Sequence, residues 1–294
     1  MEKSKVMGHI FAIITILVWG SCFVLTKNLL VYFTPIQIIP LRMGLAYITL
    51  WVLRPKTLRL PWKDELMFIL IGITGGSFYF FLQNTALDHT YAANVSILVA
   101  LSPILTVLLA QLFSRSNERL GKYVYIGAVI AIAGVVLVVL NGQMSFHLSP
   151  VGDLLALAAA LMWAVYSVLI KKYTEQYDNF IVTRRVFLWA FLTAVPLMLL
   201  TETPTMPNIM ACWTSIIYAA VFSGAMGYTL QMVGQKYTDP TLASLLMCLE
   251  SVFAAVGGWI ILGEVLSPRE LIGCLLMLSA SVIAQLPEKR SSIA

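Results

Sequence analysis

One acidic residue stands inside an otherwise apolar stretch. Glu250 lies within the hydrophobic run 241–262, and at about 1.5 Å of rise per helical residue it falls near the middle of a bilayer. An ionisable group at that depth costs about 2.5–3.5 kcal/mol on insertion scales, so it must be protonated, paired or wetted by a cavity. Glu250 could therefore bind a solute or carry a coupling proton. Alternatively, it could hold neighbouring helices together through hydrogen bonds.

Arginine also occurs within the apolar runs. Arg42 lies inside the run 35–53 and could pair with an anionic group in a cavity or play a structural part. With Glu250 it is our candidate for coupling. Arg184 and Arg185 open a later apolar run, where a long side chain can reach the membrane interface, so we expect anchoring there. Arg185 follows Arg42 by 143 positions, which predicts near-equivalent places in two halves.

Two tryptophans are predicted at mid-membrane. Trp19 and Trp163 each lie well inside an apolar run, and Tyr166 shares the face of Trp163. Tryptophan normally prefers the membrane interface. A central pair could therefore form a binding wall that stacks on a flat or aliphatic solute or contacts a cation. Ordinary helix packing is the alternative interpretation.

Further polar residues lie on otherwise apolar helices. Tyr79 and Gln83 share one helix face, and Gln231 lies near the end of a later helix. These residues could line vestibules of a pathway, although ordinary interhelical hydrogen bonds fit equally well. Asn94 is a further candidate to line the solute cavity. It lies in the same apolar run as Pro103, which is central in that run. A proline there predicts a kink that frees carbonyl groups, and this kink is a candidate hinge.

Composition defines the elements that must position these residues. Hydrophobic residues make up 60% of the chain and charged residues 11%, with a mean hydropathy of +0.87; soluble proteins average about 25% charged residues. The chain is predicted to be an all-α integral membrane protein with ten transmembrane helices, since a span needs about 20 apolar residues. The predicted spans are 10–29, 35–53, 65–86, 92–113, 121–140, 151–171, 181–200, 211–234, 241–262 and 270–286.

The ten spans form two copies of a five-helix unit. Trp19 and Lys27 recur 144 positions later as Trp163 and Lys171. An odd number of spans per copy predicts two inverted five-helix repeats, which we place at residues 1–145 and 146–294. Inverted repeats are typical of secondary transporters, whose solute site lies near the midplane between the copies.

The distribution of Lys and Arg predicts the orientation. Cytoplasmic loops carry an excess of these residues, so we expect both termini to be cytoplasmic in a bacterial inner membrane. The net charge of +5 and the pI near 9.0 follow from this topology and need no nucleic-acid partner. The other side holds only Lys27 and Arg269, whereas the cytoplasmic side holds Lys3, Lys5, Arg54, Lys56, Arg59, Lys63, Arg115, Arg119, Lys122, Lys171, Lys172, Lys236, Lys289 and Arg290.

Three segments resemble a known family. WGSCFVLTK in the first span, LRMGLA in the second and LESVFAAVGGWIILGEVLSPRELIG across the ninth and tenth are similar to the EamA-type branch of the drug/metabolite transporter superfamily. The resemblance covers essentially the whole chain. It implies an inner-membrane exporter of small metabolites, such as amino acids, that works by alternating access. The sequence departs from the family where the Trp–Gly pair of the first span becomes Trp163–Ala164 in the sixth.

The leading hypothesis is secondary export of a small organic metabolite, with a proton as the expected coupling ion. Facilitated diffusion fits the sequence equally well. No nucleotide-binding loop is evident, and the three histidines have no metal-ligand pattern, so we expect no cofactor, no metal and no enzymatic activity. A sensor or structural membrane protein and an intramembrane enzyme are the alternatives. Small residues in the fifth and tenth spans would allow pairing within one chain or in a homodimer.

Overall fold

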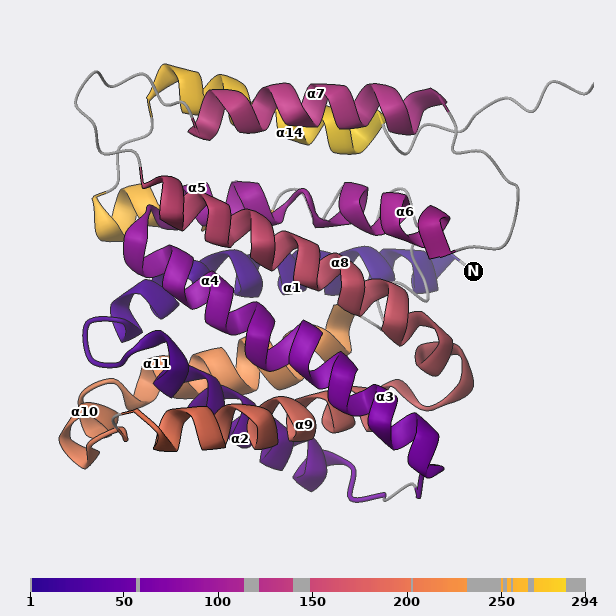
Figure 1. Ribbon diagram of the computed structural model, residues 1–294, viewed down its shortest axis with the longest axis vertical. Coiled ribbons are helices and arrows are strands. Elements are labelled where there is room, and N and C mark those ends of the chain that lie inside the picture. Colours follow the sequence, from indigo (N-terminus) through magenta and orange to yellow (C-terminus); the bar gives the residue numbers. More distant parts are fainter. Residues whose placement is uncertain are drawn as a thin grey trace, which may run out of the picture.

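The computed structural model describes residues 2–56, 59–113, 122–139, 149–201, 203–231, 250, 253–254, 256–263 and 267–283, which are helices and short connections without strands. Figure 1 shows long helices lying roughly parallel in one bundle. The elements are α1 (Glu2–Leu29), α2 (Pro35–Leu53), α3 (Trp62–Gly72), η1 (Ile73–Ser77), α4 (Phe78–His89), α5 (Ala92–Val99), α6 (Ser102–Phe113), α7 (Lys122–Val139), α8 (Pro150–Gln176), α9 (Asn179–Leu199), α10 (Met206–Ala211), α11 (Trp213–Ile217), η2 (Tyr218–Gly227), η3 (Gly258–Leu262) and α14 (Pro268–Ile283).

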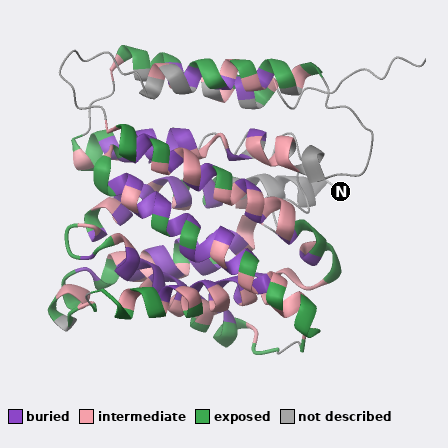
Figure 2. Cartoon of the chain, viewed as in Figure 1, coloured by how far each residue is buried: buried purple, intermediate pink, exposed green. Residues whose placement is uncertain are grey.

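The predicted all-α membrane fold is confirmed. Among the described residues, four helices are long and apolar enough to cross a membrane: Pro35–Leu53, Trp62–His89, Pro150–Gln176 and Asn179–Leu199. Figure 2 shows exposed positions along α7 and α14. Large apolar residues are among them, such as Val129, Ile132, Leu271 and Leu275, as expected for a surface that faces lipid. Most of the predicted ninth span, 241–262, lies outside the described residues, so the number of ten is not tested.

The third and eighth spans share a local irregularity. Each contains a π-helical segment, η1 in the third and η2 in the eighth. In these two spans the repeat spacing is 148 positions, since Gly76 and Gln83 recur as Gly224 and Gln231. Adding 148 to Ile73–Ser77 gives 221–225, which lies inside η2. Segments of π-helix are rare and occur often at functional sites. Both halves therefore widen the same helix at the same point.

The fourth span is interrupted, although not at the proline itself. α5 ends at Val99 and α6 begins at Ser102, so Pro103 occupies the first turn of α6. Proline is tolerated there because that turn has no intrahelical partner for its backbone nitrogen. The predicted kink is thus a break at Ala100 and Leu101. The side chain of Pro103 lies outside the described part of the structure.

Helix pairs follow the two-fold repeat. α1 packs against η2 as α8 packs against η1 and α4, so the first and sixth spans take matching partners. α2 packs along α9, and α7 along α14, which joins the second span to the seventh and the fifth to the tenth. Ala131 of α7 and Ala280 of α14 belong to one buried cluster. The small residues of the fifth and tenth spans are therefore used within the chain.

Glycines permit the close crossings between halves. A Cβ added to Gly76 would lie 2.3 Å from the Cβ of Ala190, and one added to Gly224 would lie 3.2 Å from the Cβ of Ala46. These two contacts are repeat counterparts. Gly76 corresponds to Gly224 at the spacing of 148 positions, and Ala46 corresponds to Ala190 at the spacing of 144. Small residues allow such approaches in lipid, where no hydrophobic force drives helices together.

Candidate functional site

Five aromatic side chains meet inside the bundle. The ring centroids of Trp19 and Trp163 are 6.1 Å apart in an edge-to-face arrangement. Tyr79 and Tyr166 each lie 5.0 Å from Trp163, and Tyr228 lies 5.3 Å from Trp19. We call these residues the aromatic cluster. The structure thus brings together the four aromatic residues named from sequence, although their role in binding stays a prediction.

The π-helical segments η1 and η2 contact the rings of this cluster. The Trp19 indole N–H donates to the carbonyl of Ser223 in η2 at 2.9 Å. A Cβ at Gly227 would lie 2.3 Å from the Trp19 nitrogen, and one at Gly75 in η1 would lie 2.0 Å from the Tyr166 ring. Each half therefore offers a glycine in its widened helix, and an aromatic ring from the other half rests on it.

Arg42 reaches the same region from α2. Its side chain is only 6% exposed, and Nη2 donates to the Ser223 hydroxyl at 2.8 Å. The guanidinium lies 4.2 Å from the centroid of the Phe80 ring, within the range of a cation–π contact. Its Nε is buried and has no hydrogen-bond partner within the described part of the chain. Ser223 joins Arg42 to the aromatic cluster, because its carbonyl accepts from Trp19.

Glu250 brings a carboxyl group to this site. It is helical and partly buried, and a Cβ at Gly20 would lie 2.9 Å from its backbone oxygen, so this stretch of chain presses directly on α1 beside Trp19. The carboxyl lies within electrostatic range of Arg42, and Tyr79 and Tyr228 lie within range of both charges. The Tyr228 hydroxyl is buried, and no described residue forms a hydrogen bond with it.

Arg184 and Arg185 do not repeat the environment of Arg42. Thr34 is the N-cap of α2 and Asp178 the N-cap of α9, which sets the spacing between these helices at 144. In that alignment Val186 corresponds to Arg42, so Arg185 lies one helical position from the place of Arg42, which is about 100° around the axis. Both later arginines lie at the end of the bundle where α9 begins, which agrees with anchoring.

The remaining predicted residues lie in separate places. Gln83 is buried on α4, one turn beyond Tyr79. Asn94 is buried on α5, where its amide donates to the Thr90 hydroxyl at 3.4 Å. Its Oδ1 has no hydrogen-bond partner among the residues that the structure describes. Gln231, partly buried, is the last described residue of the eighth span.

Sequence reasoning missed three members of the site, Ser223, Tyr228 and Phe80. Phe80 and Tyr228 are common types of apolar span residue, but they are also repeat counterparts at the spacing of 148 positions, so the repeat could have marked them. Ser223 could have been found from the repeat, because it corresponds to Gly75 at the spacing of 148, and both lie in the π-helical segments. The site as a whole offers one cation, one carboxyl, an unpartnered hydroxyl and aromatic walls. Among the described residues, no group of three His, Cys, Asp or Glu side chains could hold a metal ion.

Comparison with known proteins gives consistent similarities. Residues 6–140 and 150–285 each match the EamA-like transporter family. Over 87% of this chain and 89% of the relative, the sequence is 26% identical to an uncharacterized transporter of Archaeoglobus fulgidus. It is 25% identical to the uncharacterized transporter YyaM of Bacillus subtilis, over 92% of each protein.

Two further similarities concern an exporter and a fold. The sequence is 25% identical to a protein of Streptantibioticus cattleyicolor named "Probable terminal-alkyne amino-acid exporter", over 93% of this chain and 91% of that protein. A solved crystal structure superposes with a TM-score of 0.68 at 21% identity, covering 96% of this chain and 97% of the other. The latter similarity concerns the fold alone.

Proposed function

This chain belongs to the EamA-like transporter family, and we propose that it exports small organic solutes with an amino-acid-like head group by alternating access. It is a multi-pass membrane transporter. The observation that carries the finer proposal is the buried Arg42, which shares one site with Glu250 and the aromatic cluster. The exporter name of the Streptantibioticus relative supports the same direction and solute class.

A zwitterion complements the charges of this site. The Arg42 guanidinium has an unpartnered Nε, which could donate to a solute carboxylate. Glu250, as a carboxylate, could accept from a solute ammonium group, and the Tyr228 hydroxyl could complete its own bonding with either group. The rings of Trp19 and Trp163 would contact the solute side chain, where the aliphatic or flat part needs an apolar wall.

We propose that Glu250 also carries the coupling proton. An intramembrane carboxyl is tolerated when it is protonated or paired, and here both options are open because Arg42 lies within electrostatic range. Protonation would remove the carboxylate that accepts from the solute ammonium group, and loss of the proton would restore it. Solute and proton would thereby compete for Glu250, as the exchange of an outgoing solute for an incoming proton requires.

We place residues 1–145 and 146–294 as inverted repeats in a bacterial inner membrane, with both termini cytoplasmic. The matched packing of α1 with η2 and α8 with α4 supports a two-fold relation between the halves. An inverted pair of this kind can exchange the conformations of its halves, which opens the central site to alternate sides.

Flux measurements in proteoliposomes test this function. Amino acids, neutral metabolites and small cations would be compared, with and without an imposed pH gradient, in the wild type, Glu250→Gln and Arg42→Lys. We expect wild-type flux of zwitterions that follows the pH gradient. Glu250→Gln should abolish that dependence, and Arg42→Lys should weaken zwitterion transport because the ammonium cannot bind a carboxylate in the bidentate manner of arginine.

A matched control is Glu175→Gln, which removes an exposed carboxylate near the end of α8. It should transport as the wild type does. Flux that ignores the pH gradient and survives Glu250→Gln would replace coupled export by facilitated diffusion. No flux of any tested solute from correctly folded protein would reject the transport assignment for these classes.

A further inference from the structure

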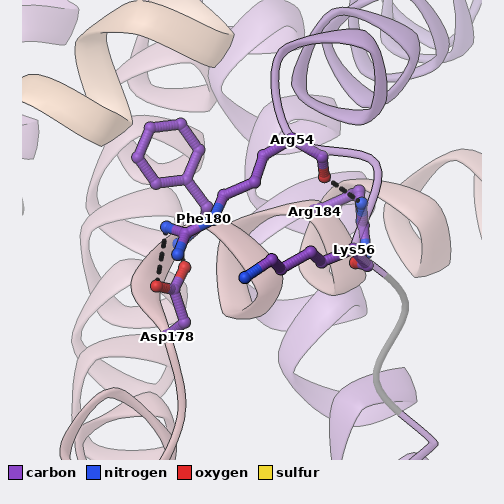
Figure 3. A network of polar contacts seen from close by, with 5 residues as sticks. All are labelled: Arg54, Lys56, Asp178, Phe180 and Arg184. Atoms are coloured by element: carbon purple, nitrogen blue, oxygen red, sulfur yellow. Dashed lines mark hydrogen bonds and ion pairs between the residues drawn. The ribbon is translucent and has the colours of Figure 1, made fainter.

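An ion pair joins two loops at the end of the bundle where α3 and α9 begin. Figure 3 shows Arg54, which follows α2, pointing toward Asp178 at the start of α9, with Nη1 and Oδ2 2.7 Å apart. The other carboxylate oxygen of Asp178 accepts from the backbone N–H of Phe180 at 3.0 Å and so caps α9. Asp178 therefore both starts a helix of one half and holds a loop of the other.

Arg184 closes the end of α2. It is 7% exposed, and its guanidinium donates to the carbonyl of Arg54 at 2.8 Å and to the carbonyl of Lys56 (Figure 3). Arg54 is the C-cap of α2, where unpaired carbonyls and the negative end of the helix dipole favour a cation. A side chain from the second half thus completes a helix of the first half.

Further contacts extend the junction to α3. Glu65 pairs with Arg185 at 3.3 Å and accepts from the Trp189 indole at 2.9 Å. The Asp64 carboxylate accepts from the hydroxyls of Tyr173 and Tyr177, each at 3.2 Å. We call the contacts between Arg54, Lys56, Asp64 and Glu65 on one side and Tyr173, Tyr177, Asp178, Arg184, Arg185 and Trp189 on the other the clasp.

The repeat predicts a matching junction at the opposite end, where the α1–α2 loop faces the α9–α10 loop. There a pocket of about 310 Å³ lies between these loops, lined among others by Thr34, Asp88, Thr203 and Asn208. The Asn208 amide donates to the Tyr32 carbonyl at 2.9 Å across this end.

The sequence explains why the two ends differ. At the spacing of 144, Asp178 corresponds to Thr34, Arg184 to Pro40 and Arg185 to Leu41. The three charged groups that the second half contributes to the clasp are thus uncharged at the opposite end. Among the described residues, the opposite end therefore has no equivalent of the Arg54–Asp178 and Arg185–Glu65 ion pairs.

We propose that the clasp is the gate that holds the cytoplasmic end closed while the opposite end is open. The proposal rests on the proposed function, because a gate has meaning only in a transporter. Opening toward the cytoplasm requires the Arg54–Asp178 and Arg185–Glu65 pairs to separate and Arg184 to leave the end of α2. The pocket at the opposite end then closes as the halves exchange their conformations.

Thiol labelling of the full-length protein in membranes tests the gate without a solute. A reporter Thr203→Cys in the pocket, with the four native cysteines replaced by alanine, would react with a membrane-impermeant maleimide added from outside. Asp178→Asn removes the charge but keeps a good N-cap, since asparagine caps helices as well as aspartate does. We expect Asp178→Asn and Arg54→Gln each to slow labelling by about twofold to fivefold, the range that an exposed ion pair supports.

Glu175→Gln is the control, since it removes a nearby exposed carboxylate outside the clasp; it should label at the parent rate. Gel filtration verifies that each variant is folded. Unchanged or faster labelling in both clasp variants would overturn the gate. Slower labelling in a protein that moves none of the tested solutes would support the gate and reject the proposed function. Normal coupled flux with unchanged labelling would support the proposed function and reject the gate.

Discussion

The two glycine crossings offer a comparison in which one substitution is made at two repeat-related sites. In Gly76→Ala the new Cβ would lie 2.3 Å from the Cβ of Ala190, whereas in Gly224→Ala it would lie 3.2 Å from that of Ala46. Carbon atoms pack best at about 3.5–4.0 Å. Gly76→Ala therefore requires the helices to separate by more than about 1 Å, and Gly224→Ala by only about 0.3 Å.

These displacements give different free energies of unfolding. Overpacking of a tight contact costs about 1–3 kcal/mol, and alanine regains up to about 1 kcal/mol of helix propensity over glycine. We expect Gly76→Ala to lose about 1–2 kcal/mol of stability, which lowers the melting temperature by about 2–8 °C. For Gly224→Ala the two effects nearly cancel, and the melting temperature should stay within about 2 °C of the wild type.

Thermal unfolding in detergent, followed by gel filtration or tryptophan fluorescence, measures both variants. The double variant Gly76→Ala/Ala190→Gly removes the clash and should recover most of the lost stability. Equal destabilisation at the two glycines, or no recovery in the double variant, would refute the argument that the Gly76 crossing is limited by Cβ contact.

Two further predictions concern the site and the clasp. Trp19→Phe keeps an aromatic ring but loses the indole N–H that donates to the Ser223 carbonyl. It should reduce the free energy of unfolding by about 0.5–1.5 kcal/mol and lower solute flux. Wild-type values in unfolding and flux assays would argue against a role for this hydrogen bond. Burial, the Asp64 hydrogen bond and the Asp64 charge raise the pKa of Tyr177 above its ordinary value near 10. Folding then favours the protonated hydroxyl, so its contribution is present below about pH 10 and is lost as the pH rises through the folded pKa. Unfolding midpoints from pH 8 to 11 should therefore fall more steeply for the wild type than for Tyr177→Phe, and parallel curves would contradict this.

Much of the fold could be predicted from the sequence because a bilayer imposes strong constraints. Backbone groups in lipid must be paired within each helix, so long apolar runs predicted helices without knowledge of their partners. The boundaries of α2 match the predicted span 35–53. The recurrence of Trp19 as Trp163 predicted two related halves. Because both residues lie well inside apolar runs, their rings were predicted to lie deep in the bundle.

The sequence by itself determined the membrane class, the repeated halves and the residues that are costly in lipid, because each follows from composition, spacing or the price of burying charge. Only the tertiary structure decided how those residues meet. The widened helices η1 and η2, the seat of Trp19 on Ser223 and Gly227, and the place of Tyr228 depend on packing between halves that are far apart in the chain. The helix register also separated the environment of Arg42 from that of Arg185, because one helical position turns a side chain by about 100° and directs it to a different neighbour.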